Sequence, residues 1–199
     1  MTGERDDAPG AEVVLVRHAE TDWSLAGRHT GRTDIPLTEG GRSAAAGLAA
    51  VLEADRFARV LVSPSRRAQE TCELAGLGDM SEVRHDLLEW DYGAYEGLTT
   101  LQIRAERSDW DLWRDGCPGG ESAADVGARA DRVIGELRRL GGVAAVFSHG
   151  HLLRVLGARW ADLPPQAGAR LGLSPGGVCL LGHERSTPII ARWNEAAGA

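Results

Sequence analysis

Two histidines follow apolar, strand-like runs of this sequence at the same spacing. His18 lies two residues past the run 13–16, and His149 lies two residues past the run 143–147. A neutral imidazole is a competent nucleophile near pH 7, because its unperturbed pKa is about 6.5. Either histidine alone could be structural, but two at equivalent strand ends favour a reactive site.

Arginines accompany these histidines. Arg17 directly precedes His18, and Arg67 lies near the start of a predicted helix. Guanidinium forks match the oxygens of a phosphoryl group, and the N-terminus of a helix adds backbone N–H donors for the same anion. We expect Arg66 at the surface, because adjacent residues lie on different faces of a helix. These residue types indicate phosphoryl chemistry.

Phosphate-ester cleavage also needs a proton for the departing oxygen. A carboxyl group with a raised pKa can supply that proton, and such a general acid is worth about 10²–10⁴ in rate. Glu89, in a loop after Leu88, is a candidate for this role. Residue type alone does not distinguish it from Asp86, Asp91 or Glu96.

Short, continuous apolar runs predict the strands that must position these side chains, because strands buried on both faces read in this way. The three clearest runs are 13–16, 60–62 and 143–147. Weaker strands are expected near Val83 and, as a late hairpin, over 177–181 and 188–191. Helical patterns occupy 38–54, 63–74, 98–115, 121–140 and 151–160.

Strands that alternate with helices indicate an α/β fold, with a mainly parallel sheet covered on both faces. Ligands of such sheets bind beyond the carboxyl ends of the strands. Three predicted strands end on Arg17-His18, on 63–67 and on Ser148-His149, so these groups should meet at one edge. Residues 98–120 interrupt the alternation and are the candidate cap. We expect one domain over 1–199, with a flexible tail over 1–10.

Composition limits the partners. The chain has 199 residues and a formal net charge of -7, which disfavours binding to nucleic acid or to an anionic membrane. Cys72, Cys117 and Cys179 are widely spaced and favour reduced thiols over a disulfide framework or a zinc site. The first ten residues contain no apolar signal segment, and no run approaches about 18 apolar residues, so we expect a cytoplasmic protein.

Four blocks, in order along the chain, resemble motifs of the histidine phosphatase superfamily in its phosphoglycerate mutase-like branch, branch 1. The segment Arg17-His18-Ala19-Glu20-Thr21 resembles the R-H-G-E-T signature, and 27–38 continues that likeness. Residues 63–71 look like the block S-x-x-x-R-A-x-x-T, and 88–97 contain Glu89, Gly93, Glu96 and Gly97 at the spacing of the family's E-x-x-x-G-x-x-E-G block. Ser148-His149-Gly150 matches the second-histidine block. The chain is most similar to actinobacterial acid phosphatases of this branch.

The resemblance implies a three-layer α/β/α sandwich with a mostly parallel central sheet and a small helical cap insertion at about 98–120. It implies hydrolysis of phosphate monoesters of small molecules through a phosphohistidine on His18, with no metal and no cofactor. Arg17, Arg67 and His149 would bind the phosphoryl oxygens, and Glu89 would act as general acid and base. A homodimer is common among relatives and stays open here.

Substrate contacts are expected from five further residues: Ser24, Thr30, Gly31, Glu121 and Ser122. Ser24 stands where many members of the family carry Asn, and its hydroxyl can still donate to a phosphate oxygen. Glu121 and Ser122 could instead cap the long helix that follows them. The remaining histidines are expected at the surface or behind the site: His29, His85, His151 and His183.

One residue departs from the first motif. Ala19 stands where the family usually has Gly, and a methyl group would matter there if the backbone needed a positive φ or a very close approach to phosphate. We expect the alanine to be tolerated, because the charged and imidazole groups around it are retained.

Two other functions remain open. A mutase that moves phosphate between hydroxyl groups of a phosphoglycerate would use the same core with a second anion site in the cap, for which Arg104, Arg107 and Arg114 are available. A non-catalytic phosphate-binding module would lack one of the core residues, and none of them is missing. An assay for interconversion of phosphoglycerates and an assay for turnover separate these readings from hydrolysis.

Overall fold

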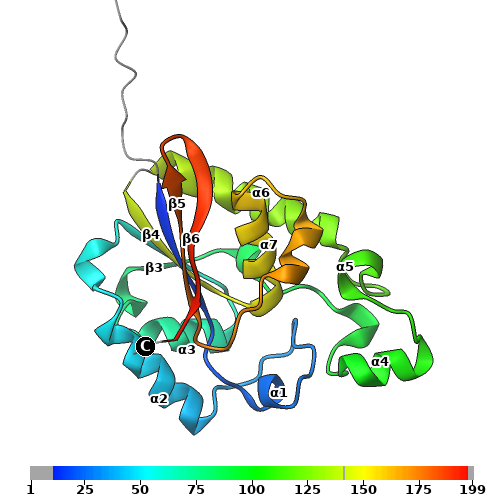
Figure 1. The fold of residues 1–199 in the computed structure, drawn as a ribbon. Helices are drawn as coiled ribbons and strands as arrows, with labels where there is room; N and C mark the ends of the chain where they lie inside the picture. The colour runs from blue at the N-terminus through cyan, green and yellow to red at the C-terminus, as the bar shows by residue number, and fades with distance from the viewer. Residues whose placement is uncertain (1–10, 141, 197–199) are drawn as a thin grey trace, which may run out of the picture.

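The computed structural model describes residues 11–140 and 142–196, and a mixed sheet runs through its centre (Figure 1). The strands are β1 (Glu12–Arg17), β2 (Arg59–Val62), β3 (Ser81–Val83), β4 (Val143–Ser148), β5 (Val178–Glu184) and β6 (Thr187–Glu195). Their order in the sheet is β3-β2-β4-β1-β5-β6. The first four run parallel to one another, whereas β5 and β6 form an antiparallel hairpin. The expected strands, including the weak one near Val83 and the late hairpin, are confirmed.

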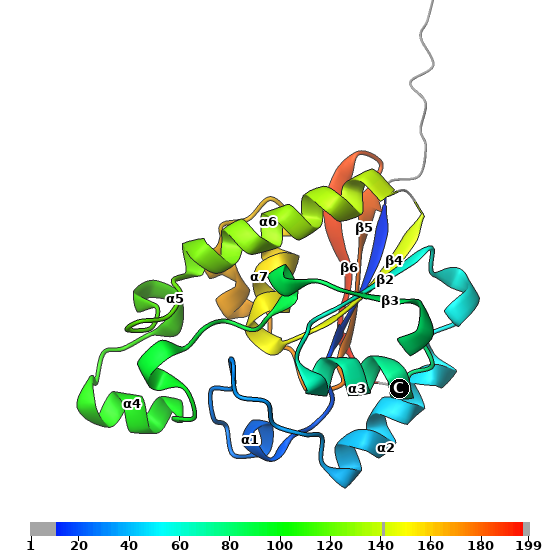
Figure 2. The ribbon, with the colours of Figure 1, turned by 180° about the vertical axis from the view of Figure 1, so that it is seen from behind.

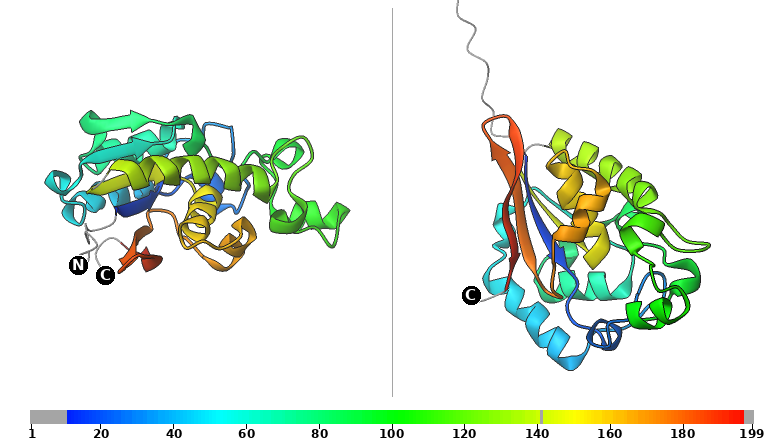
Figure 3. Two further views of the ribbon diagram at one scale, coloured as in Figure 1. Left: turned by 90° about the horizontal axis from the view of Figure 1, so that it is seen from above. Right: turned by 45° about the vertical axis from the view of Figure 1, so that its right-hand side comes forward.

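Helices occupy the segments between the strands. The α-helices are α1 (Asp22–Leu25), α2 (Glu39–Gly47), α3 (Arg66–Leu74), α4 (Thr100–Glu106), α5 (Leu112–Asp115), α6 (Ala123–Leu140) and α7 (Gly150–Trp160). Short 3-10 helices are η1 (Leu48–Ala50), η2 (Ala54–Arg56), η3 (Gly78–Met80), η4 (His85–Leu87), η5 (Gly93–Tyr95) and η6 (Pro165–Arg170). Strand β6 lies at the edge of the sheet that is remote from α4 and α5 (Figure 3).

Alternate residues of β1 pack on opposite faces of the sheet, because side chains along a strand alternate between its two faces. Val13 and Leu15 belong to a core that they share with side chains of α6 and α7. Val14 and Val16 belong to a second core with side chains of η1 and α3, and α2 packs on α3. Two helical layers therefore enclose the sheet, which confirms the three-layer α/β/α sandwich.

Two helix boundaries differ from the sequence-based prediction. Helix α2 ends at Gly47 and continues only as the 3-10 turn η1, short of residue 54, because the chain must bend for Leu52 and Phe57 to enter the second core. Helix α3 begins at Arg66 with Ser65 as its N-cap, later than the start at residue 63 that the sequence predicted. The Ser63 hydroxyl is hydrogen-bonded to His149.

The register of β1 and β4 brings the two histidines together. Arg17 lies opposite Ser148 in the parallel pair, so the next residues, His18 and His149, leave the sheet at the same edge. The backbone N–H of His18 donates to the carbonyl of Ser148 at 2.8 Å. Strand β2 pairs with β4 on its other side and delivers Ser63 to this edge.

Residues 98–120 contain two short helices beyond the sheet. Thr99 caps α4 through a reciprocal pair of hydrogen bonds with Gln102, and the Asp111 carboxylate accepts from the first N–H groups of α5. Helices α4 and α1 lie at the same end of the molecule in both opposite views (Figures 1 and 2), and a β-bridge joins Arg28 to Thr99. The helical pattern predicted over 98–115 is thus present as two short helices.

The expected tail over 1–10 lies outside the described residues. Of the helices that the structure describes, none combines the length and the apolar character needed to cross a bilayer.

Candidate active site

A cavity of about 260 Å³ opens where β1 and β4 end. Arg17 and His18 line it from the end of β1, and Gly150 and His151 line it from the start of α7, which follows β4. Glu89 also lines this cavity, so three of the five predicted catalytic residues reach its wall. The other two, Arg67 and His149, lie buried next to it.

His18 is oriented by its own neighbour. Its Nδ1 lies 2.8 Å from the carbonyl oxygen of Ala19, and because a carbonyl only accepts, Nδ1 carries the proton and donates. The lone pair of Nε2 is therefore free. The side chain is 4% exposed, and burial, reinforced by the positive charges of Arg17 and Arg67, lowers the pKa of His18 well below its usual value. The ring is a neutral nucleophile at neutral pH.

His149 is held by a serine from the neighbouring strand. Its Nε2 lies 2.8 Å from Ser63 Oγ, and both side chains are fully buried. The backbone N–H of Ser65 donates to the same hydroxyl at 3.4 Å, and within the described residues the hydroxyl has no acceptor other than His149 Nε2, so we assign the hydroxyl proton to that bond. His149 Nδ1 then carries the ring proton, and this buried atom has no hydrogen-bond partner among the described residues. The two histidine rings lie 5.3 Å apart.

Arg67 is fixed by backbone carbonyls rather than by a carboxylate. Its Nη1 donates to Thr33, and its Nη2 donates to Thr30 and Gly31, at 3.0 to 3.1 Å. Gly31 has no room for a side chain, because a Cβ would lie 2.7 Å from the carbonyl of Trp90. Burial lowers the pKa of Arg67, and Glu89 partly opposes that shift. Arg67 Nε is buried and lacks a hydrogen-bond partner within the part of the chain that is described.

Arg17, like Arg67, is held by a backbone carbonyl. Its Nη1 donates to the carbonyl of Leu173, and its guanidinium lies against Gly150, where a Cβ would stand 3.2 Å from the guanidinium carbon. Burial is the largest cause that lowers the pKa of Arg17. Arg17 Nε is also buried, and nothing in 11–140 or 142–196 accepts its proton.

Glu89 is tied to the start of α7. Its Oε1 accepts from the backbone N–H groups of Leu152 and Trp90 at 2.9 Å, and its Oε2 accepts from the N–H of His151 at 3.0 Å. The N-terminus of a helix carries a partial positive charge that attracts a carboxylate. The side chain is 5% exposed and faces the cavity that His18 lines.

Three buried donors without partners thus lie around the His18 ring: Arg17 Nε, Arg67 Nε and His149 Nδ1. Buried polar groups in proteins are almost always hydrogen-bonded, so a cluster of unsatisfied donors marks the place of an absent acceptor. Two of the three belong to guanidinium groups. An anion with several oxygens, such as a phosphoryl group, fits this arrangement.

The five predicted substrate-binding residues are divided between two places. Ser24 and Thr30 line the cavity, although the Ser24 hydroxyl is already bonded to the backbone of Thr21. Gly31, Glu121 and Ser122 are not part of its lining. The N–H of Gly31 is bound by Glu96, Glu121 pairs with Arg129, and Ser122 caps α6 through Asp125.

Two histidines that the sequence did not place at the site also line the cavity. His29 and His151 both line the cavity, so the expectation that they lie at the surface or behind the site is wrong for these two. His151 Nδ1 lies 2.6 Å from the hydroxyl of the buried Tyr92, which packs against His29. The sequence contains one indication that His151 reaches the cavity, because this residue lies in the first turn of the helix after His149. His29 reaches the cavity only through a long loop.

Ala19 is compatible with the fold. It is not among the residues with a positive φ, so the backbone does not require glycine there. Its N–H donates to Thr71 Oγ1 at 3.1 Å, and its methyl group packs in a small buried cluster with Leu37 and Ala45.

Metal ligands are not gathered at the site. Within 11–140 and 142–196, no group of three His, Cys, Asp or Glu side chains is placed to hold a metal ion.

Several known proteins are similar to this chain over most of its length. An acid phosphatase of Mycobacterium tuberculosis (strain ATCC 25618 / H37Rv) is 44% identical over 184 residues, which cover 90% of each chain. A 2,3-bisphosphoglycerate-dependent phosphoglycerate mutase of Gloeobacter violaceus is 31% identical over 78% of each chain. A solved structure of an open reading frame product of Mycobacterium tuberculosis superposes with a TM-score of 0.89 and 39% identity, and covers 94% of this chain and 98% of that one.

A family model described as "Histidine phosphatase superfamily (branch 1)" matches residues 13–196. This match runs through every element from β1 to β6 and includes all the residues around the cavity. The chain therefore belongs to branch 1 of the histidine phosphatase superfamily.

Proposed function

We propose that this protein hydrolyses phosphate monoesters of small molecules through a phosphohistidine on His18. The observation that carries the proposal is the set of three buried, unpartnered donors around the free Nε2 of His18. Similarity to an acid phosphatase over nine-tenths of the chain supports it.

In the first step, His18 Nε2 attacks phosphorus in line with the ester oxygen, a P–N bond forms and the P–O bond breaks. Arg17, Arg67 and His149 donate to the non-bridging oxygens and stabilise the charge of the transition state. Glu89, in its protonated form, gives its proton to the departing oxygen. Because His18 is neutral in its buried site, no proton has to leave the ring before the attack.

In the second step, water replaces the alcohol in the pocket. The Glu89 carboxylate takes a proton from that water, the oxygen attacks phosphorus, and the P–N bond breaks to regenerate neutral His18 with release of phosphate. Glu89 thereby recovers the proton that it lost. No step requires a metal ion or an organic cofactor.

Hydrolysis is favoured over mutase activity. The mutase hypothesis needs a free cationic group in 98–120, but the three arginines there are bonded locally. Arg104 donates to the carbonyl of Trp110, and Arg107 and Arg114 both pair with Asp115. None of the three lines the cavity. The acid phosphatase is also more similar to this chain than the mutase is, in both identity and coverage.

Replacement of the nucleophile tests the proposal. His18→Ala should lower the hydrolysis of p-nitrophenyl phosphate by about 10⁴-fold or more, because no other group can form the intermediate. Wild-type enzyme quenched during turnover in alkaline denaturant should carry one phosphoryl group that is labile in acid, and mass spectrometry should locate it on His18. EDTA should leave the rate unchanged. Full activity of His18→Ala, or the label on another residue, would end the proposal.

From the sequence we further propose that the protein is cytoplasmic and has no nucleic-acid partner. We also propose that it can form a homodimer. Light scattering of the purified protein decides between monomer and dimer. A parallel assay for conversion of 3-phosphoglycerate to 2-phosphoglycerate should detect no more than a trace of product.

A further inference from the structure

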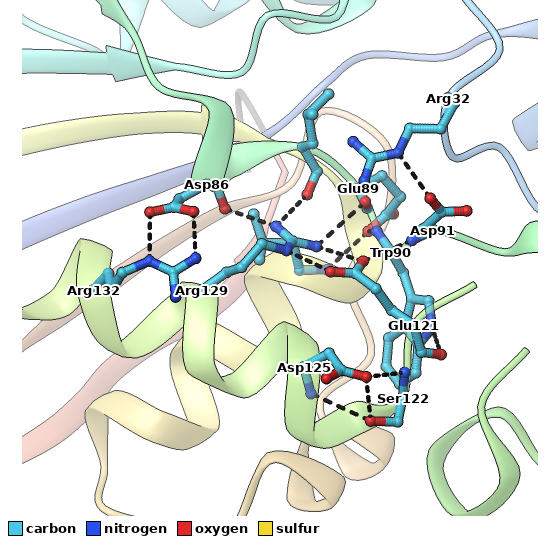
Figure 4. A network of polar contacts seen from close by, with 12 residues as sticks. Arg32, Asp86, Glu89, Trp90, Asp91, Glu121, Ser122, Asp125, Arg129 and Arg132 are labelled. Atoms are coloured by element: carbon cyan, nitrogen blue, oxygen red, sulfur yellow. Dashed lines mark hydrogen bonds and ion pairs between the residues drawn. The ribbon is translucent and has the colours of Figure 1, made fainter. Parts of the chain in front are cut away.

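One arginine behind the cavity holds the loop that carries Glu89. Arg129 projects from α6, its side chain is 12% exposed, and it lies against residues 86–89 (Figure 4). Its Nη1 donates to the carbonyls of Asp86 and Leu88 at 2.7 and 2.9 Å, and its Nη2 donates to the carbonyl of Glu89 at 3.4 Å. Three contacts to carbonyls between residues 86 and 89 thus fix the backbone up to the residue that faces the substrate.

The same guanidinium pairs with Glu121 in a two-pronged contact. Arg129 Nε donates to Glu121 Oε1 at 2.7 Å, and Nη2 donates to Oε2 at 2.8 Å (Figure 4). A guanidinium has five N–H donors. The contacts to the loop and to Glu121 therefore occupy all five of them.

Glu121 fixes the residues that follow Glu89. Its Oε2 accepts from the N–H of Asp91 at 2.8 Å, and its own N–H donates to the carbonyl of Asp91 at 2.9 Å. Its carbonyl accepts from Trp90 Nε1 at 2.9 Å. Together, Arg129 and Glu121 hold the loop on both sides of Glu89, and we call this pair the clamp.

The Glu89 side chain is itself attached to a different helix. Its carboxylate accepts from N–H groups at the start of α7, whereas its backbone is attached to α6 through the clamp. The position of the carboxylate relative to His18 therefore depends on both attachments. Misplacement of a reacting group by about 1 Å can lower a rate by about 10²-fold.

We propose that Arg129 and Glu121 are positioning residues for general acid catalysis by Glu89. The inference rests on the proposed function, because it takes Glu89 as the proton donor. Neither clamp residue lines the cavity, so neither touches the substrate. Their effect is transmitted through the backbone of the loop.

The leaving group distinguishes this role from a general effect on folding. An alkyl phosphate expels a strongly basic alkoxide and depends on the proton from Glu89, whereas p-nitrophenyl phosphate expels a stable phenolate and depends on it much less. The value of kcat/KM reports the steps up to departure of the alcohol. The ratio of the two kcat/KM values is independent of the fraction of enzyme that is folded, because that fraction cancels.

The experiment compares kcat/KM for β-glycerol phosphate and p-nitrophenyl phosphate in wild type and four variants. Glu89→Gln should lower the value for the alkyl ester about 10²–10⁴-fold more than that for the aryl ester. Arg129→Gln and Glu121→Gln should lower the ratio in the same direction, by about 10–100-fold. Arg132→Gln is the matched control.

Arg132 suits this control because it lies on the same helix and contacts the same loop. Within the part of the chain that the structure describes, it pairs only with the side chain of Asp86, and its own side chain is 58% exposed. The ratio in Arg132→Gln should equal that of wild type. If a clamp variant is poorly soluble, Arg129→Lys retains the charge with three donors in place of five, and should lie between wild type and Arg129→Gln.

The outcomes separate the two hypotheses. An unchanged ratio in both Arg129→Gln and Glu121→Gln, with Glu89→Gln showing the large change, would overturn the inference and leave the proposed function standing. An unchanged ratio in Glu89→Gln itself would remove Glu89 as the acid, and with it the basis of the clamp proposal. A lower ratio in the clamp variants but not in Arg132→Gln supports it.

Discussion

The inner end and the rim of the cavity are built differently. At the inner end, His18, Arg67 and His149 are buried, and Arg67 and His149 carry donors that have no acceptor among the described residues. At the rim, Ser24 and Thr30 are partly exposed, and their hydroxyl groups are already bonded to nearby carbonyls. The inner end is thus arranged in advance for one kind of ligand, whereas the rim is not committed to any.

We infer from this difference that the inner end determines the rate of the reaction, whereas the rim determines which substrates are preferred. Fixed donors in a site without water interact strongly with developing charge and need no rearrangement during the reaction. Partly exposed hydroxyl groups on a loop contribute modestly to binding, because they exchange one hydrogen bond for another. We therefore expect substitutions at the inner end to lower the rate for every substrate, and substitutions at the rim to change the order of preference among substrates.

Among the further substitutions that test this division, the largest effect is expected at Arg67. Arg67→Lys should lower kcat/KM for p-nitrophenyl phosphate by about 10²–10³-fold, because an ammonium group cannot reproduce the forked contacts of a guanidinium. Arg66→Lys is the control, since Arg66 is adjacent, its side chain is 66% exposed and it faces Glu70. Steady-state kinetics on both proteins measures the difference. Similar losses in the two variants would contradict the division into inner end and rim.

An intermediate effect is expected in the pH dependence of stability. Burial lowers the pKa of His18 and His149 in the folded protein, so below pH 6.5 the unfolded chain binds more protons than the folded one. The free energy of unfolding should therefore fall as pH drops from about 6.5, by up to about 1.4 kcal/mol per pH unit for each histidine. Urea denaturation between pH 7.5 and 5.5 measures this slope.

A variant assigns that slope to the buried rings. His149→Gln should flatten it by removing one buried ring whose pKa is lowered in the folded protein. An unchanged slope in His149→Gln would show that groups other than this buried ring control acid stability.

The smallest effect is expected at the rim. Thr30→Val removes a hydroxyl that donates to the carbonyl of Arg28 at 3.1 Å, but it keeps the Thr30 carbonyl that binds Arg67. KM should change by less than about 10-fold, in a direction that differs among substrates, because one hydrogen bond contributes about 0.5–1.5 kcal/mol. Kinetics on a panel of sugar phosphates, phosphoglycerates and nucleotides tests this. A uniform fall in kcat would mean that Thr30 belongs to the inner end.

Much of the fold could be predicted because its signals are local. The buried run at 13–16 is apolar on both faces, and a strand of that kind requires helices on either side. His18 and His149 were also accessible, since parallel strands in register deliver the residues that follow them to one edge. The end of α2 could not be predicted from the sequence, because the bend after Gly47 depends on where Leu52 and Phe57 can pack.

The wider site depends on contacts between distant segments. Nothing in the sequence around Arg129 indicates that its side chain reaches carbonyls some forty residues earlier in the chain. Glu121 was expected at the substrate, on the strength of its position after two glycines, and its carboxylate is found on Arg129. Backbone carbonyls that serve as ligands, such as those of Thr30 and Gly31 on Arg67, carry no signal in residue type.

The hydrogen bond from His18 Nδ1 to the carbonyl of Ala19 has an energetic consequence for the intermediate. A ring that retains this proton while Nε2 bears the phosphoryl group is a cation. Its partner is a neutral dipole rather than a carboxylate, and Arg17 and Arg67 stand nearby. On the proposed mechanism, the phosphorylated enzyme is therefore a high-energy, short-lived species. Its phosphoryl group is transferred readily from His18 to water in the second step.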